Sequence, residues 1–219
     1  MMKKITSIIF LMILNFSFAQ NSDLKIIKKP INYSPERIQL SLEYLKEHHG
    51  LIQKTATITP KIIVLHYTAA GNVESNFKYF NKTYLESARN TLKKQSKLNV
   101  SSQFIIDRDG TVYQLMEPDQ FARHTIGLNY CAIGIENIGS KTQPLTEKQV
   151  VANAQLIRLL TQKYKIEYLI GHSEYGAFRN SKLWKETDSK YFTEKEDPGK
   201  DFMSKVRHQV TDLKLKEKP

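Results

Sequence analysis

Two histidines and one aspartate stand where a buried strand or a rigid turn would hold them. His66 follows the apolar run IIVL, His172 follows the apolar run of IEYLIG, and Asp197 directly precedes Pro198-Gly199. Neutral imidazole and carboxylate are common zinc ligands, and a set of three leaves the fourth tetrahedral position open for water. The pattern is compatible with a catalytic zinc site. A lone histidine at a strand end is more often a satisfied core residue, and no HExxH helix gathers the ligands in sequence.

Glu136 and Lys195 could add further chemistry to such a site. Glu136 lies in the otherwise apolar stretch CAIGIENIG. A carboxylate inside an apolar strand is costly unless it is paired or has a task, so the alternatives are a partner base, solvent contact or a functional role. Lys195 stands two residues before Asp197, and the Pro-Gly turn that follows would hold both.

The surrounding sequence alternates between helices and strands. Ser34 as N-cap, Pro35 at the first helical position and Gly50 as the stop predict a helix after an extended lead-in. Asp109-Gly110 predicts a hairpin between two strands within 101–116. The remaining predicted elements are helices over 73–96 and 146–165, strands over 61–66, 131–139 and 166–172, and a final helix. This order predicts an α/β fold in which a mixed central β-sheet is flanked by helices.

Three other groups of residues have structural explanations. His48 and His49 fall in the last turn of the first helix, where cations interact favourably with the helix dipole, so we favour that role over metal binding. Cys131, the single cysteine, is interpreted as a buried small hydrophobic residue rather than a reactive thiol. Asp107 and Asp109 are better explained by the hairpin turn than by a calcium loop, which needs further oxygen ligands.

The N-terminus predicts export. Residues 1–19 contain two lysines, an apolar run and small residues before the expected cleavage point, the pattern of a signal peptide. The apolar run spans 14 residues, fewer than the roughly 18 typical of a transmembrane helix, although an uncleaved anchor is the alternative. We expect a periplasmic or extracellular protein with no transmembrane segment after cleavage. The net charge of +11 favours polyanionic surroundings, and export argues against nucleic acid.

Six segments, taken in order, resemble the zinc-dependent N-acetylmuramoyl-L-alanine amidases (amidase_2), whose fold is shared with the peptidoglycan recognition proteins. They are VLHYTA, SSQFIIDRDGTVYQLM, ARHTIGLN, AIGIENIG, GHSE and KEDPGKDF. The resemblance implies a single domain with zinc at the base of a groove, bound by His66, His172 and Asp197. It also implies that Glu136 orients or deprotonates water and that Lys195 stabilises charge on the scissile carbonyl. Ser102 occupies the place where phage-type members carry a tyrosine.

The resemblance also points to residues that line the groove. His124, in ARHTIG where the family often has Trp-His-Ala-Gly, is expected to contact substrate, with a plain structural hydrogen bond as the alternative. Tyr67 and Thr68 are expected to shape the groove or to hold His66. The long segment 173–196 resembles the recognition-protein branch and contains Arg179, a candidate substrate contact, and Trp184, which could equally be a core anchor.

The sequence therefore predicts an exported zinc hydrolase that cuts the amide bond between N-acetylmuramic acid and L-alanine in peptidoglycan or its fragments. The alternatives are a module that binds muropeptides without cutting them and a structural protein held on the wall by its basic surface. We expect a signal peptide over 1–19, an N-terminal extension with a helix over 20–57, an amidase domain over 58–212 and a frayed tail over 213–219. We also expect a monomer.

Overall fold

The computed structural model describes residues 24–86 and 90–219. The predicted signal peptide lies outside these residues. Within them, six strands form one sheet in the order β1-β4-β3-β5-β2-β6. The strands are β1 (Ile26–Lys28), β2 (Ile62–Tyr67), β3 (Phe104–Ile106), β4 (Val112–Gln114), β5 (Ala132–Asn137) and β6 (Tyr168–Gly171). Only the β3–β4 pair is antiparallel in this part of the chain, so the predicted mixed sheet is confirmed.

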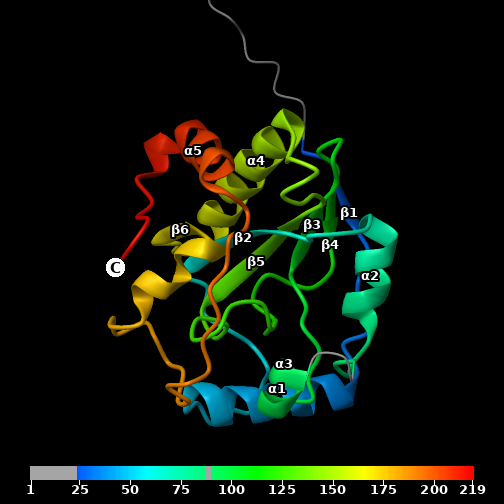
Figure 1. The fold of residues 1–219 in the computed structure, drawn as a ribbon, viewed down its shortest axis with the longest axis vertical. Coiled ribbons are helices and arrows are strands. Elements are labelled where there is room, and N and C mark those ends of the chain that lie inside the picture. Colours follow the sequence, from blue (N-terminus) through cyan, green and yellow to red (C-terminus); the bar gives the residue numbers. More distant parts are fainter. Residues whose placement is uncertain (1–23, 87–89) are drawn as a thin grey trace, which may run out of the picture.

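Helices cover both sides of the sheet (Figure 1). One apolar cluster joins α4 and α5 to β2 and β5 through residues such as Leu156, Val206 and Ile133. A second cluster packs Tyr44 and Leu45 of α1 beneath the other side. The helices are α1 (Pro35–His49), α2 (Val73–Asn81), α3 (Asn90–Gln95), α4 (Glu147–Lys163) and α5 (Lys200–Gln209), with short helical turns η1 (His172–Phe178) and η2 (Thr211–Leu213).

Helix α1 begins and ends at the residues that the sequence predicts. The Ser34 side chain accepts a hydrogen bond from the Arg37 backbone N–H at 3.2 Å, and Pro35 occupies the first turn. Gly50 ends the helix with φ +64, a conformation that favours glycine. The hairpin prediction is also confirmed, because the Gly110 N–H donates to the Asp107 carbonyl at 2.9 Å within the β3–β4 turn.

The predicted helix over 73–96 is wrong in its middle. α2 ends at Asn81, and α3 begins at Asn90. Side chains from elsewhere satisfy the last carbonyls of α2: Arg37 donates to the carbonyls of Phe80 and Lys82 at 2.8 and 2.7 Å. These tertiary contacts replace the continuing helical hydrogen bonds, which no local periodicity could have indicated.

The predicted frayed tail over 213–219 is also wrong in part. Lys216 pairs with β6, accepting from the Leu169 N–H at 2.9 Å and donating to the Glu167 carbonyl at 3.0 Å. Leu213 and Leu215 pack against the core cluster under α4 and α5. Leu213 belongs to η2, and Lys216 forms an isolated bridge with Tyr168 on β6, so this segment is held against the sheet edge without continuing it as a strand.

Several structural expectations are confirmed. Cys131 is buried and free. Trp184 packs against the core cluster beside α1, and an added Cβ at Gly127 would come 2.6 Å from its indole ring. This favours the core-anchor interpretation of Trp184.

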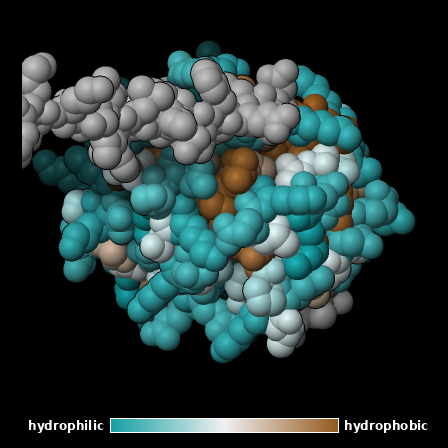
Figure 2. Space-filling model, turned by 90° about the horizontal axis from the view of Figure 1, so that it is seen from above, coloured by the Kyte–Doolittle hydropathy of each residue, from teal (hydrophilic) through white to brown (hydrophobic). Residues whose placement is uncertain are grey.

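The face of the molecule seen from above the view of Figure 1 is mostly polar. Figure 2 shows a predominantly hydrophilic face with small apolar areas. None of the helices in the described ranges combines the length and the apolar character that a bilayer-spanning segment needs. Large hydrophobic side chains exposed in those ranges are Ile52, Tyr84, Val151 and Leu159.

Candidate metal centre and active-site cavity

The carboxyl ends of three neighbouring strands bring predicted site residues together. His66 lies near the end of β2, and Glu136 lies directly opposite it on β5. His172 follows β6, which flanks β2 on the other side. Residues in register on adjacent strands project from the same face of a sheet. Asp197 arrives from the turn before α5, so four elements build the site.

The three metal-ligand candidates converge on one point. One ligand atom each of His66, His172 and Asp197 lies within 4.8 Å of the others, and all three residues are buried. Asp197 Oδ2 lies 3.2 Å from Nδ1 of His66 and 3.1 Å from Nδ1 of His172. Two ligands of a tetrahedral zinc with bonds of about 2.0–2.1 Å are about 3.3 Å apart. The donor types and spacings therefore fit a zinc ion with one open position.

The electrostatic environment favours the metal-binding protonation states. Burial, reinforced by the neighbouring His66, lowers the pKa of His172 to about 4. Burial alone would raise the pKa of Asp197, but its contacts with His172 and His66 outweigh that effect and hold the pKa below the usual range. Near neutral pH His172 is neutral and Asp197 is ionised, the forms in which these side chains bind a metal.

Glu136 and Lys195 line the same cavity as the three ligand candidates, and its volume is about 380 Å³. Glu136 is half-buried, as expected for a carboxylate at the end of a central strand. Lys195 is exposed, and its positive charge helps to lower the pKa of His172. The segment before Pro198 thus delivers both a carboxylate and a cation to the cavity.

Tyr67 and Thr68 also line this cavity. The Tyr67 hydroxyl donates to Glu196 Oε1 at 3.0 Å, and burial together with Glu196 raises the pKa of Tyr67 to about 12. The Thr68 N–H donates to the carbonyl of Asn137 at 3.0 Å. These contacts tie the end of β2 to β5 and to the segment that carries Asp197.

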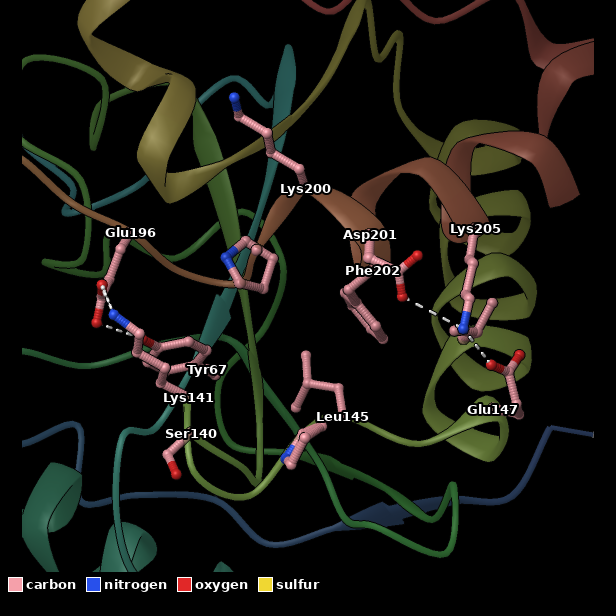
Figure 3. Close-up of a pocket in the computed structure, with 14 residues that line it drawn as sticks. Tyr67, Ser140, Lys141, Leu145, Glu147, Glu196, Lys200, Asp201, Phe202 and Lys205 are labelled. Atoms are coloured by element: carbon pink, nitrogen blue, oxygen red, sulfur yellow. Dashed lines mark hydrogen bonds and ion pairs between the residues drawn. The ribbon is translucent and has the colours of Figure 1, made fainter.

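A second cavity of about 320 Å³ shares Tyr67 with the first (Figure 3). Its floor includes Leu145 and Phe202. On one side Glu196 meets Tyr67 and the Lys141 ammonium, the latter at 3.5 Å. On the other side Lys205 pairs with Glu147 at 2.6 Å and with Asp201 at 3.3 Å. Tyr67 thus lines both cavities, whereas its partner Glu196 lines the second.

His124 lines the cavity that contains the three ligand candidates, but both of its ring nitrogens already have hydrogen-bond partners within the protein. Nε2 lies 3.1 Å from the Ala132 carbonyl, and Nδ1 lies 3.1 Å from Nε2 of His66. Burial, reinforced by His66, holds the pKa of His124 well below its usual value, so the ring is neutral.

Arg179 is the one predicted site residue that the structure places away from this cavity. It lies at the end of η1, where its guanidinium stacks 4.6 Å from the centre of the Phe192 ring. It also donates to the Ser189 carbonyl at 3.4 Å. Arg179 and Trp184 line a different hollow beside the 173–196 segment.

Sequence reasoning missed two polar residues next to the site. The Asn137 side chain donates to the backbone carbonyl of His66 at 3.1 Å. Arg123 lines the cavity although it is only 2% exposed, and it donates to the carbonyl of Leu98 at 2.5 Å and to the Tyr191 hydroxyl at 3.1 Å. The signal for Asn137 was a polar side chain within a mostly apolar stretch, whereas the mixed segment around Arg123 carries no such signal.

Comparison with solved structures shows a shared fold. The chain is 21% identical to the N-acetylmuramoyl-L-alanine amidase LysC from Clostridium intestinale, with a TM-score of 0.53 over 89% of this chain and 100% of that chain. A selenomethionine derivative of AmpD gives 19% identity and a TM-score of 0.53, covering 86% of this chain and 94% of that one. Bumblebee PGRP-SA gives 17% identity and a TM-score of 0.51, and the match covers 90% of this chain and 100% of that one.

A search among curated proteins finds no match. The sequence model of one family, described as N-acetylmuramoyl-L-alanine amidase, matches residues 56–200 and thus most of the chain, including every ligand candidate. The chain belongs to the N-acetylmuramoyl-L-alanine amidase family.

Proposed function

We propose that this protein is a zinc hydrolase that cuts the amide bond between N-acetylmuramic acid and L-alanine in peptidoglycan or its fragments. Membership of the amidase family supports a peptidoglycan ligand. The observation that carries the enzymatic proposal is the convergence of His66, His172 and Asp197 in a cavity that Glu136 and Lys195 also line.

The roles proposed for the residues follow from their chemistry. Zinc held by the three ligands would polarise the scissile carbonyl and lower the pKa of a bound water. The Glu136 carboxylate would accept a proton from the attacking water and return it to the nitrogen of the leaving L-alanine. The Lys195 ammonium would stabilise negative charge on the carbonyl oxygen. Tyr67 and Thr68 would shape the cavity wall against the substrate.

The place of action is proposed from the N-terminal sequence. The pattern over residues 1–19 supports export to the periplasm or the extracellular space, where peptidoglycan or muropeptides are the partners. We propose that the protein acts there as a monomer, with residues 58–212 as the amidase domain.

The test is to incubate the purified full chain with peptidoglycan, with and without a chelator, and to analyse the released products by mass spectrometry. We expect peptides that begin with L-alanine, lost with chelator and restored by zinc. Glu136→Gln is the matched variant, because it keeps the shape of the side chain and removes its charge. It should bind zinc and release peptide about 10²–10⁴-fold more slowly.

Two other outcomes decide against this proposal. Intact peptidoglycan together with muropeptide binding by the zinc-loaded protein would show a non-catalytic recognition module. Absence of both zinc binding and muropeptide binding would leave the structural-protein alternative, for which Glu136→Gln should change only stability.

A further inference from the structure

The ring of His124 has little freedom to move. Its backbone N–H donates to Asn129 Oδ1 at 2.8 Å, and the Thr125 N–H donates to the same oxygen at 2.7 Å. The ring lies over Gly134 of β5, where an added Cβ would come 2.9 Å from the ring. Glycine at 134 therefore leaves the space in which the ring sits, and Asn129 fixes the backbone from which it extends.

The partners of the ring determine which nitrogen of His124 carries hydrogen. Nε2 faces the Ala132 carbonyl at 3.1 Å. Because a carbonyl oxygen can only accept, Nε2 must donate. In the neutral ring the other nitrogen, Nδ1, then has a lone pair and acts as an acceptor.

This assignment extends to His66. Nε2 of His66 lies 3.1 Å from Nδ1 of His124. Two lone pairs would repel at this distance, so His66 Nε2 must carry the hydrogen. The Thr125 hydroxyl, 2.9 Å from the same Nδ1, can also donate and does not change this requirement. A neutral His66 is then left with its lone pair on Nδ1, the atom 3.2 Å from Asp197 Oδ2, and a metal ion held between these two atoms would remove the repulsion between their lone pairs.

We propose that His124 is a positioning residue, which fixes the tautomer of His66 so that Nδ1 is the nitrogen presented to the metal. The inference rests on the proposed zinc site and concerns a group that does not touch the ion. Hydrogen-bonding partners of metal-binding histidines set ring orientation and tautomer, and their loss typically weakens metal affinity about 10–100-fold.

This role differs from the substrate contact that the sequence suggested. Both ring nitrogens of His124 already have partners, Ala132 and His66, within the protein. A substrate could not hydrogen-bond to either nitrogen without displacing one of those partners. The ring of His124 is therefore placed to act on His66 rather than on a substrate.

The test uses the full chain labelled with ¹⁵N-histidine and loaded with Zn²⁺. The chain has only six histidines, so their ring signals can be assigned by substitution. In the wild type we expect His66 to show a metal-bound Nδ1 and an Nε2–H whose proton exchanges slowly with solvent. His124→Phe removes the acceptor, and we expect a zinc affinity about 10–100-fold lower and loss of the slowly exchanging proton.

His124→Asn provides the matched rescue, because its side-chain oxygen can occupy nearly the place of Nδ1. It should restore the slow Nε2–H and most of the zinc affinity. Thr125→Val is the control, since it removes the other group at Nδ1 while keeping the side-chain shape. The tautomer of His66 should not change in that variant.

Each outcome bears on a separate claim. Wild-type protein that binds no zinc would defeat the proposed zinc site itself. Wild-type protein that binds zinc through Nε2 of His66 would overturn the role of His124 alone, and so would an unchanged tautomer and affinity in His124→Phe. If that variant does not fold, the wild-type spectrum and His124→Asn still decide the question.

Discussion

Two buried contacts between histidine and carboxylate call for opposite charge states. At the candidate metal centre, Asp197 lies against the Nδ1 atoms of His66 and His172. At the end of α1, His48 Nδ1 lies 2.9 Å from Glu186 Oε1, and Nε2 lies 3.0 Å from the carbonyl of Gln95. Both partners of His48 can only accept, so its ring must donate from both nitrogens and carry a positive charge.

The pKa values follow this difference in partners. Burial would lower the pKa of His48, but hydrogen bonds to Glu186 and to the Gln95 carbonyl outweigh burial and raise it. His172, whose largest influences are burial and a second histidine, has its pKa lowered to about 4. The set of neighbouring acceptors, rather than residue type, therefore separates a histidine that favours the proton-bound form from one that is a candidate metal ligand.

The largest effect is expected at the candidate metal centre, the first of the two regions compared. Asp197→Ala removes the anionic ligand, so we expect loss of bound zinc and a fall in kcat/KM of about 10³-fold or more, because metal polarisation contributes several kcal/mol. Metal analysis and product release from peptidoglycan measure the two effects. A folded variant that keeps both zinc and activity would remove Asp197 from the centre.

Glu136→Gln should separate chemistry from metal binding. The carboxylate lies on the strand next to His66 and outside the ligand set. We expect kcat to fall about 10²–10⁴-fold while zinc content is unchanged, since a general base contributes about that factor. Steady-state kinetics beside zinc analysis checks this. Loss of zinc in this variant would instead make Glu136 part of the metal site.

Glu186→Gln should affect stability rather than activity. It leaves the buried His48 without its carboxylate, and hydrogen bonds to charged groups contribute about 1.5–3 kcal/mol. Because the folded pKa of His48 is raised, this contribution is fully present below the unfolded pKa of about 6.5 and is lost as pH rises through the folded value.

Urea unfolding of the wild type and Glu186→Gln, at about pH 6 and about pH 9, measures this difference. The gap in unfolding free energy should shrink at the higher pH, and zinc affinity should be the same in both proteins. A gap that grows with pH would mean that His48 is neutral in the folded protein. Weaker zinc binding in the variant would show that the two regions are coupled.

The smallest effect is expected from Arg179→Ala. This arginine stacks on Phe192, outside the metal cavity. If it has no substrate role, kcat/KM should change by no more than about 2-fold, with a stability change within about 1 kcal/mol for a lost cation–π contact. Substrate binding weakened by an order of magnitude, at unchanged stability, would restore the substrate contact that the sequence suggested.

Much of the fold was predictable because its signals are local. The buried strand before His66, the capped helix from Pro35 and the Asp109-Gly110 turn each carry their own pattern. The candidate ligands could also be named, because two of them end apolar strands. The predicted elements were wrong where side chains distant in sequence determine local structure. One example is the end of α2, where Arg37 donates hydrogen bonds to the carbonyls of Phe80 and Lys82.

The residues that contact the candidate ligands without being ligands themselves were harder to predict. No sequence pattern indicates that the Asn137 side chain donates to the backbone carbonyl of His66. None indicates that the ring of His124 contacts the ring of His66 either. The exposed position of Arg179 depends on the path of the long segment after β6, which has no periodic pattern to fix it. The opposite charge states of His48 and His172 likewise follow from residues far along the chain.

The parallel pairing of β2 has a consequence for biosynthesis. β2 pairs with β5 and β6, and the ligand candidates stand at positions 66, 172 and 197. Contacts between residues so far apart in sequence form late, and a chain made at about 5–20 residues per second spends several seconds without them. A nascent or truncated chain that ends before Asp197 lacks one of the three candidate ligands, so the proposed hydrolytic activity would be withheld until synthesis had passed that residue.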